Sequence, residues 1–315
     1  MTSSIAFGPV PSRRLGMSLG INNIPPKVCS YSCVYCQLGN TLKSQTERTE
    51  FFEPEEIVQA VYERIGKVES SGERIDYLTF VPDGEPTLDL NLGMEIEALK
   101  DTGIKVAVMT NSSLLWMHET REDLEQADWV SVKVDTVDPT IWMRINRPSP
   151  DISIKRVMDG IVLFSEEFEG TLVTETMLVD GLNDEVKTFR MNRDFIKQLN
   201  SDIAYISIPT RPPAEPWVKP PSEEKVNQAY QIYMEKISHV ELLTGYEGNS
   251  FAFTGDPVED ILGITSVHPM RREAILQMLT KANAGWSLIE DLIAAGQLKE
   301  IEYSGFKFYM KVYST

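Results

Sequence analysis

Residues 29–36 read CSYSCVYC and hold all three cysteines of this 315-residue chain. The spacing is C-x3-C-x2-C, on a segment too rich in Ser and Tyr for an apolar core. Closely spaced cysteines in a reduced chain indicate metal binding or catalysis. Structural zinc, the first competing interpretation, needs four protein ligands. The histidines that could supply the fourth, His118, His239 and His268, all lie far away in sequence.

Outward from this loop, short apolar runs rich in β-branched residues alternate with stretches of helical periodicity. Strands are expected at 17–21, 76–81, 105–109, 129–134, 172–179 and 203–208. Helices are expected near 54–68, 90–101, 119–126, 153–167, 185–199 and 222–237. Strand–helix units at this spacing predict parallel strands joined by helical crossovers. The expected fold class is α/β, a partial (βα)6 TIM-type barrel, and a doubly wound sheet fits the same order of elements.

The last sixty residues follow a different pattern. Helices near 270–281 and 286–295 precede strands at 298–303 and 306–312, and Ser304-Gly305 between these strands is a hairpin signal. This order predicts a small winged-helix-like unit. We expect the barrel over residues 1–250 and the small C-terminal unit over 257–315.

Composition and charge exclude several classes of protein. A hydrophobic content of 42% with only three cysteines excludes a disordered chain and a disulfide scaffold. The net charge of −17 makes nucleic acid an unfavourable partner, because binding to phosphate backbones depends largely on basic residues. The sequence contains no run of about 18 apolar residues that would predict a membrane span. The first residues lack the features of a signal peptide, so we expect a cytoplasmic location, where thiols stay reduced.

In barrels and open α/β sheets, catalytic side chains gather at the carboxyl ends of the strands. Polar residues follow five of the six expected strands at that end. They are Gly84-Glu85, Asn111-Ser112, Asp135, Asp180 with Asn183, and Thr210 with Arg211. The sequence therefore predicts a polar opening at that edge, although polar residues there also serve ordinary turns.

A cubane iron–sulfur cluster normally takes four thiolates, one per iron, so three cysteines would leave one iron without a protein ligand. A chelator with an amine and a carboxylate could occupy that iron. The spacing resembles the signature of the radical S-adenosylmethionine (radical SAM) superfamily. The resemblance implies that Cys29, Cys33 and Cys36 are metal-binding catalytic residues that hold a [4Fe-4S] cluster. In that superfamily, S-adenosylmethionine is reductively cleaved to a 5′-deoxyadenosyl radical that abstracts hydrogen from the substrate.

Other segments resemble the superfamily over roughly residues 8–250. Tyr35 stands where the aromatic residue before the third cysteine flanks the adenine. Gly84 and Glu85 match part of a Gly-Gly-Glu motif that binds the methionine ammonium, and Asp83 replaces its first glycine. The further cofactor-binding residues that the resemblance implies are Asn111, Ser112, Lys133, Asp135, Arg144, Ser207 and Ile208.

Residues 7–21, FGPVPSRRLGMSLGI, are similar to a branch of iron–sulfur oxidoreductases related to archaeal wyosine-tRNA synthases. Those synthases bind a second cluster through additional cysteines, which this sequence lacks. The missing cysteines and the acidic net charge both disfavour tRNA modification, which stays an alternative.

The favoured interpretation is a radical SAM enzyme that acts on a small-molecule or peptide substrate and takes electrons from a low-potential flavodoxin- or ferredoxin-like donor. Candidate substrate contacts are Arg13, Arg14, Arg211 and Trp217, the last two in the proline-rich segment 209–221. One alternative is an activase or electron-delivery protein that acts on a partner protein. Another is a zinc-binding scaffold without redox function.

Overall fold

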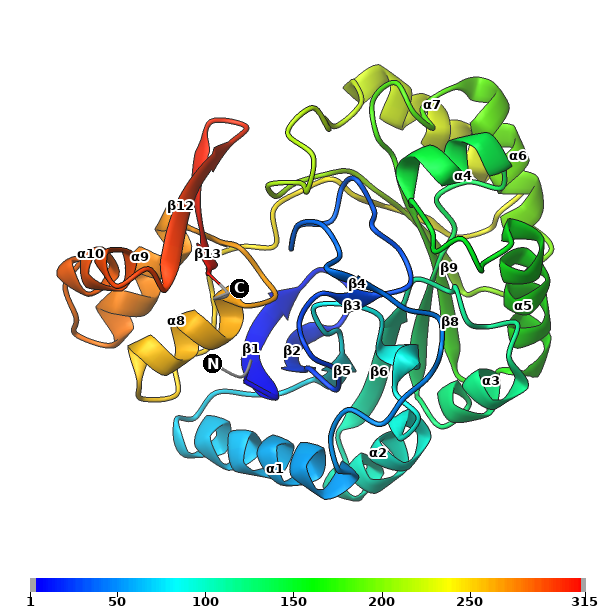
Figure 1. Ribbon diagram of the computed structural model, residues 1–315. Coiled ribbons are helices and arrows are strands. Elements are labelled where there is room, and N and C mark those ends of the chain that lie inside the picture. The colour runs from blue at the N-terminus through cyan, green and yellow to red at the C-terminus, as the bar shows by residue number, and fades with distance from the viewer. Residues whose placement is uncertain (1–3, 313–315) are drawn as a thin grey trace.

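The structure is a computed structural model that describes residues 4–312. Eight strands form its central sheet, in the order β1-β2-β5-β6-β7-β8-β9-β10 (Figure 1). The strands are β1 (Ala6–Ser12), β2 (Gly16–Ile21), β5 (Tyr77–Phe80), β6 (Lys105–Thr110), β7 (Trp129–Lys133), β8 (Thr171–Met177), β9 (Ile203–Ser207) and β10 (Val240–Leu243). The pair β1–β2 is antiparallel, and every other neighbouring pair in this sheet is parallel.

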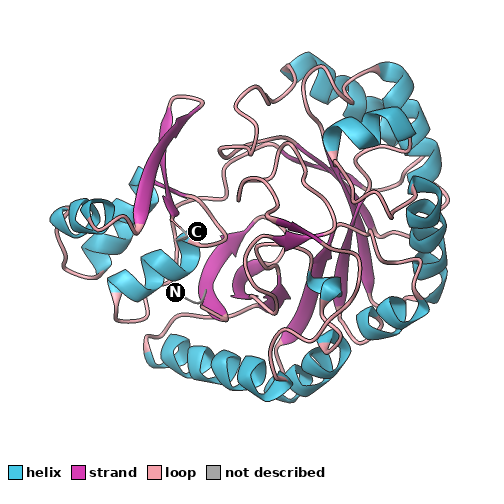
Figure 2. Cartoon of the chain, in the orientation of Figure 1, coloured by secondary structure: helices cyan, strands magenta, loops and turns pink. Residues whose placement is uncertain are grey.

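Helices cover the outer, convex side of the curved sheet (Figure 2). They are α1 (Pro54–Ser70), α2 (Leu92–Leu99), α3 (His118–Leu124), α4 (Pro139–Ile145), α5 (Ile154–Glu167), α6 (Val186–Ile196) and α7 (Glu223–Met234), with short 3-10 turns η1 (Pro86–Leu88) and η2 (Lys100–Thr102). Because these helices lie on one side of the sheet, the architecture is a partial TIM-type barrel and not the doubly wound alternative. Within residues 4–312, no helix has both the length and the apolar character needed to cross a bilayer.

The core lies between the sheet and this layer of helices. Helix α1 shows how the sequence produces this packing. It begins at Pro54, a residue that fits the first helical turn, and its apolar residues recur at intervals of three and four to form one stripe. Ile57, Val61 and Ile65 on that stripe pack with residues of the sheet in the main core, and Val68 is also buried. Burial of each such side chain contributes about 1.5–3 kcal/mol.

The six expected strands are confirmed as β2 and β5 to β9, with ends that differ by at most two residues. Strands β1 and β10 and helices α4 and α8 (Pro257–Thr265) were not expected. Strand β1 contains Gly8, Pro9 and Pro11, a composition that argues against a strand, and it is tolerated because β1 is an edge strand. Strand β10 has only four residues, too few for a clear alternation.

The C-terminal elements form a second, smaller sheet with its own apolar cluster. Strands β11 (Met270–Arg271), β12 (Leu298–Tyr303) and β13 (Phe306–Lys311) lie in the order β11-β13-β12, beside α8, α9 (Arg272–Lys281) and α10 (Ser287–Ala294). The expected hairpin is confirmed, and Ser304 and Gly305 in its turn both have positive φ. The domain limits and the winged-helix-like character of this unit stay predictions.

Helix α8 connects the C-terminal elements to the barrel. It packs beside β1 and forms an ion pair with α1. Arg64 of α1 donates to Asp260 of α8 at 2.6 Å and to the carbonyl of Gly8 in β1 at 2.8 Å. Both charged side chains are buried, so the pair fixes the position of the C-terminal elements against the first strand.

Candidate active site

The three cysteines lie on a long loop between β2 and α1, in half-buried positions and as free thiols. Two short strands, β3 (Val28–Cys29) and β4 (Lys43–Ser44), pair with each other inside this loop. Backbone bonds hold the loop to the end of α4: the Val34 amide donates to Ile145 at 2.9 Å, and the Ser32 amide donates to Asn146 at 3.0 Å. The loop is therefore fixed over the carboxyl end of the sheet.

Gly84, after β5, allows the sheet to approach this loop. A Cβ atom at residue 84 would lie 1.9 Å from the carbonyl oxygen of Val28, so any other residue would force the two segments apart. The next amide, that of Glu85, donates to the same carbonyl at 3.2 Å. This contact places the predicted Gly84-Glu85 pair directly against Cys29.

Side-chain amides donate to the sulfurs of two of the cysteines. Asn111 Nδ2 lies 3.5 Å from Cys29 Sγ, and Asn146 Nδ2 lies 3.4 Å from Cys33 Sγ. Burial raises the pKa of all three thiols, that of Cys33 to about 12. The Asn146 side chain opposes this rise at Cys33, and backbone amides oppose it at Cys29 and Cys36. Without a strong cation beside them, the three sulfurs stay protonated at neutral pH.

Glu85 is buried and joins the ends of β5 and β6. Its Oε1 accepts from the hydroxyls of Thr87 at 2.7 Å and Thr110 at 2.6 Å, and its Oε2 accepts from the Asn111 amide at 2.7 Å. Burial raises the pKa of the carboxyl, and these donors offset part of the rise. Within residues 4–312, Oε2 accepts one hydrogen bond, which leaves a lone pair for a further donor.

The turn after β6 holds Asn111 and Ser112 at the carboxyl edge of the sheet. Ser112 has φ of 70°, in the left-handed region, and its hydroxyl accepts from the Lys133 amide at 2.8 Å. Asn111 also donates to Ser30 at 2.9 Å, so one turn contacts both the cysteine loop and the next strand.

Lys133 and Asp135, at the end of β7, meet Tyr35 of the cysteine loop. The Tyr35 hydroxyl donates to Asp135, and Lys133 Nζ lies 5.2 Å from the centre of the Tyr35 ring. Asp135 also accepts from Asn146 at 2.7 Å and from the Met177 amide at 2.9 Å. The structure thus brings the end of β7 against the cysteine loop, although about a hundred residues separate Tyr35 and Asp135 in the sequence.

Comparison with known proteins identifies the family. The model of the radical SAM superfamily matches residues 23–191, more than half of the chain. The chain belongs to the radical SAM superfamily. The predicted resemblance is therefore confirmed. A UPF0026 protein of Methanocaldococcus jannaschii is 48% identical over 98% of this chain and 96% of its own.

Solved radical SAM structures share the fold at low identity. A radical SAM methyltransferase from Sphaerobacter thermophilus matches with a TM-score of 0.52 and 14% identity, over 72% of this chain and 66% of that one. SuiB of Streptococcus suis, solved bound to S-adenosylmethionine, matches with a TM-score of 0.52 and 14% identity, over 71% of this chain and 49% of that one.

The donor set of this radical SAM chain, three free thiols on one loop, fits a cluster that takes one thiolate per iron. Within residues 4–312, no three His, Cys, Asp or Glu side chains converge on a point where one metal ion could be held. His268, the one buried histidine of the three, contacts Arg211 and Glu247 instead of the cysteines.

Glu175 is a central residue that the sequence analysis missed. This carboxylate, on β8, pairs with Arg14, accepts from Lys133 Nζ at 3.2 Å and accepts from the Ser207 hydroxyl at 3.0 Å. Burial alone would raise the pKa of Glu175, but Arg14 and Lys133 outweigh burial and hold it well below its usual range. The sequence signal that could have identified Glu175 is a charged residue in the middle of the strand segment TLVTETM.

Other predicted residues have different surroundings. Arg144 is exposed on α4, and it is Asn146, just after that helix, that reaches Asp135 and Cys33. Trp217 is 49% exposed, and Ile208 packs against the main core. Arg13, Arg14 and Arg211, in contrast, line one common cavity.

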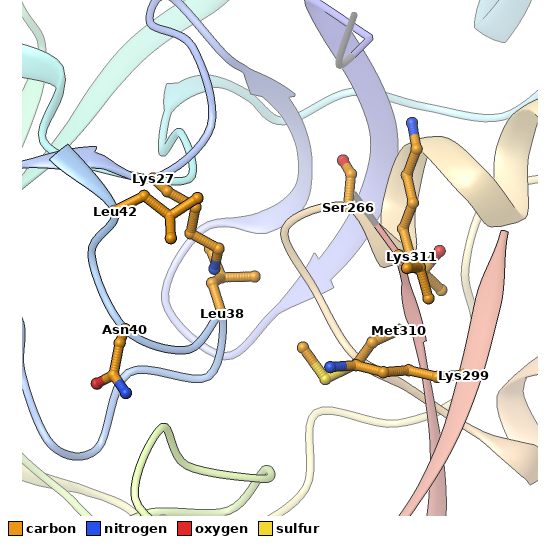
Figure 3. Close-up of a pocket in the computed structure, with 10 residues that line it drawn as sticks. Lys27, Leu38, Asn40, Leu42, Ser266, Lys299, Met310 and Lys311 are labelled. Atoms are coloured by element: carbon orange, nitrogen blue, oxygen red, sulfur yellow. The ribbon is translucent and has the colours of Figure 1, made fainter. Parts of the chain in front are cut away.

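A separate cavity of about 230 Å³ lies between the loop after Cys36 and the C-terminal hairpin (Figure 3). Leu38 and Leu42 approach it from the loop, and Lys299 and Met310 approach from β12 and β13 (Figure 3). None of the predicted cofactor or substrate residues lines it, so it is distinct from the polar site described above.

Proposed function

We propose that this protein is an enzyme in which Cys29, Cys33 and Cys36 hold a [4Fe-4S] cluster and S-adenosylmethionine binds at the remaining iron. The substrate is a small molecule or a peptide. Three half-buried thiols on one loop, two of them beside side-chain amide donors at the carboxyl edge of the barrel, carry this proposal. The S-adenosylmethionine bound to SuiB, a protein of similar fold, supports the choice of cofactor.

When bound, the cluster supplies the electron that reductively cleaves S-adenosylmethionine and yields the 5′-deoxyadenosyl radical. The chain's own residues hold this chemistry in place. Asn111 and Asn146 orient two of the sulfurs, and Gly84 lets β5 reach the loop. The free lone pair on Glu85 would accept a hydrogen bond from the methionine ammonium. Lys133 would offer a positive charge, and Asp135 a hydrogen-bond acceptor, to polar groups of the cofactor.

The proposal is tested on protein prepared and reconstituted without oxygen. We expect brown protein with about four irons per chain. After reduction with dithionite, it should convert S-adenosylmethionine into 5′-deoxyadenosine and methionine. Colourless protein with one zinc per chain, or reduced iron-containing protein that leaves the cofactor intact, would contradict the proposal.

Replacement of Glu85 tests the cofactor contact. The Glu85→Gln variant loses the negative charge that faces the ammonium, so we expect the Kd for S-adenosylmethionine to rise about tenfold or more, with iron content unchanged. Equilibrium binding and iron analysis on the same sample measure both quantities. Glu95→Gln, at a buried glutamate on α2, is the matched control and should leave the Kd unaltered. Equal affinity in the Glu85 variant and the natural protein would remove Glu85 from the site.

We also propose a cytoplasmic location and a low-potential flavodoxin- or ferredoxin-like electron donor, because the thiols must stay reduced and the cluster needs an electron. Modification of tRNA and activation of a partner protein stay alternatives. Transfer of deuterium from a labelled small-molecule or peptide substrate into 5′-deoxyadenosine would favour direct substrate chemistry over both.

A further inference from the structure

A cavity of about 120 Å³ opens between the first strands of the barrel, the cysteine loop and the C-terminal elements. Its walls come from β1, β2, β5 and β6, and from the segments around residues 211, 247 and 268. Gln37, the residue after Cys36, is one of its lining residues. The cavity therefore lies beside the loop that we propose to hold the cluster.

The charge of this cavity is opposite to that of the whole chain. Its lining holds three guanidinium groups, Arg13, Arg14 and Arg211, against one carboxylate, Glu247. Glu175, outside the lining, pairs with Arg14, so Arg13 and Arg211 supply the excess positive charge. Burial and the nearby charge of Arg211 lower the pKa of His268, so this lining histidine adds no positive charge at neutral pH. A positive cavity in a protein of net charge −17 concentrates small anions at this one place.

Arg211 is held rigidly at the side of the cavity that borders the cysteine loop. Its Nη1 donates to Gln37 Oε1 at 2.6 Å, and its Nη2 contacts Glu247 and, at 2.7 Å, His268 Nε2. Arg211 Nε and His268 Nδ1 are both buried, and neither has a hydrogen-bond partner within the described chain. Buried polar atoms without a partner are rare in folded proteins, and a bound ligand is one way to satisfy them.

Arg13 approaches from the turn between β1 and β2. Its Nη1 donates to the carbonyl of Gly245, just after β10, and this bond bridges the two edge strands of the sheet. Partial desolvation, and after it the charge of Arg211, lowers the pKa of Arg13. Since like charges held together repel, an anion bound between the guanidinium groups would offset their mutual repulsion.

We propose that this cavity binds the anionic group, a carboxylate or a phosphate, of a small substrate. The assignment rests on the proposed function, because it places that substrate beside the cysteine loop. Guanidinium groups bind both anions with paired hydrogen bonds. The volume suits a few non-hydrogen atoms, and Phe7, Val10 and Met109 supply apolar wall for the carbon skeleton next to the anion.

The test measures binding of two probes, inorganic phosphate and malonate, to the reconstituted full-length protein at constant ionic strength. Calorimetry should show saturable binding of at least one probe, and the responding probe identifies the anion. Arg13→Gln and Arg211→Gln should each weaken that binding about tenfold or more. Arg13→Gln is the safer variant for folding, because Arg13 is exposed and its side-chain hydrogen bond within residues 4–312 goes to a backbone carbonyl. Arg74→Gln, at a side chain 77% exposed, is the matched control and should bind as the natural protein does.

Formation of 5′-deoxyadenosine and the Kd for S-adenosylmethionine are measured on the same samples. Loss of probe binding in Arg13→Gln with an unchanged Kd for S-adenosylmethionine supports the substrate site. Failure of both probes to bind the natural protein, or equal binding by both variants, overturns the inference even if the cofactor is cleaved. A parallel rise in the Kd for S-adenosylmethionine would assign the cavity to the cofactor and also overturn it. Probe binding without cofactor cleavage would instead contradict the proposed function and leave the anion cavity standing.

Discussion

Replacement of Cys33 by alanine will abolish both the iron–sulfur cluster and the cleavage of S-adenosylmethionine. Iron content should fall from about four per chain to near zero, because the cluster takes one thiolate per iron and two thiolates do not hold it. Absorbance, iron analysis and 5′-deoxyadenosine formation measure the loss.

The fold should survive this substitution. Cys33 is half-buried, and Asn146, which donates to its sulfur, also donates to Asp135 at 2.7 Å. The adjacent Ser32→Ala variant is the control, since it removes one side-chain acceptor from the same loop and no sulfur. Circular dichroism should give the same spectrum for both variants and the natural protein. Full iron content and undiminished cleavage in Cys33→Ala would mean that other residues hold the metal.

Much of the site could be predicted because its residues are neighbours in sequence or follow strands. The cysteines fall within eight positions, and Glu85, Asn111 and Asp135 come at the carboxyl ends of successive parallel strands, which meet at one edge. Local pattern and strand order together were enough to place these residues side by side.

The residues that were missed contact the site over long separations. Asn146 belongs to the end of α4, a seven-residue helix that gave too short a pattern to be expected. Glu247 and His268 reach Arg211 only because the segment after β10 folds back along β1, where the Ala252 amide donates to Pro9. The sequence could not predict that this segment folds back along β1, because neither β1 nor β10 had a recognisable strand pattern.

Replacement of Glu175 by glutamine will lower the free energy of unfolding by about 3 kcal/mol at pH 7. The carboxylate lies between Arg14 and Lys133 in the interior of the barrel. Removing one partner of a buried ion pair leaves the other charge without compensation and typically costs about 3–5 kcal/mol. In the variant, Asp135 still lies 3.6 Å from Lys133 and offsets part of its charge. We therefore expect a loss at the lower end of that range. Urea unfolding gives the difference, with Glu241→Gln on the exposed side of β10 as control.

The effect of pH separates lost charge from altered packing in this variant. Arg14 and Lys133 hold the pKa of Glu175 in the folded chain below its ordinary value of 4.5. A depressed carboxyl pKa contributes stability that is fully present above the ordinary value and is lost as pH falls through the folded value. The gap between the natural protein and Glu175→Gln should therefore stay constant from pH 7 to about pH 5 and narrow at lower pH. A difference in unfolding free energy that is the same at pH 3.5 and pH 7 would assign the loss to packing.

The double variant Arg14→Gln with Glu175→Gln should lose less unfolding free energy than the two single variants added together, because each single change removes the same ion pair.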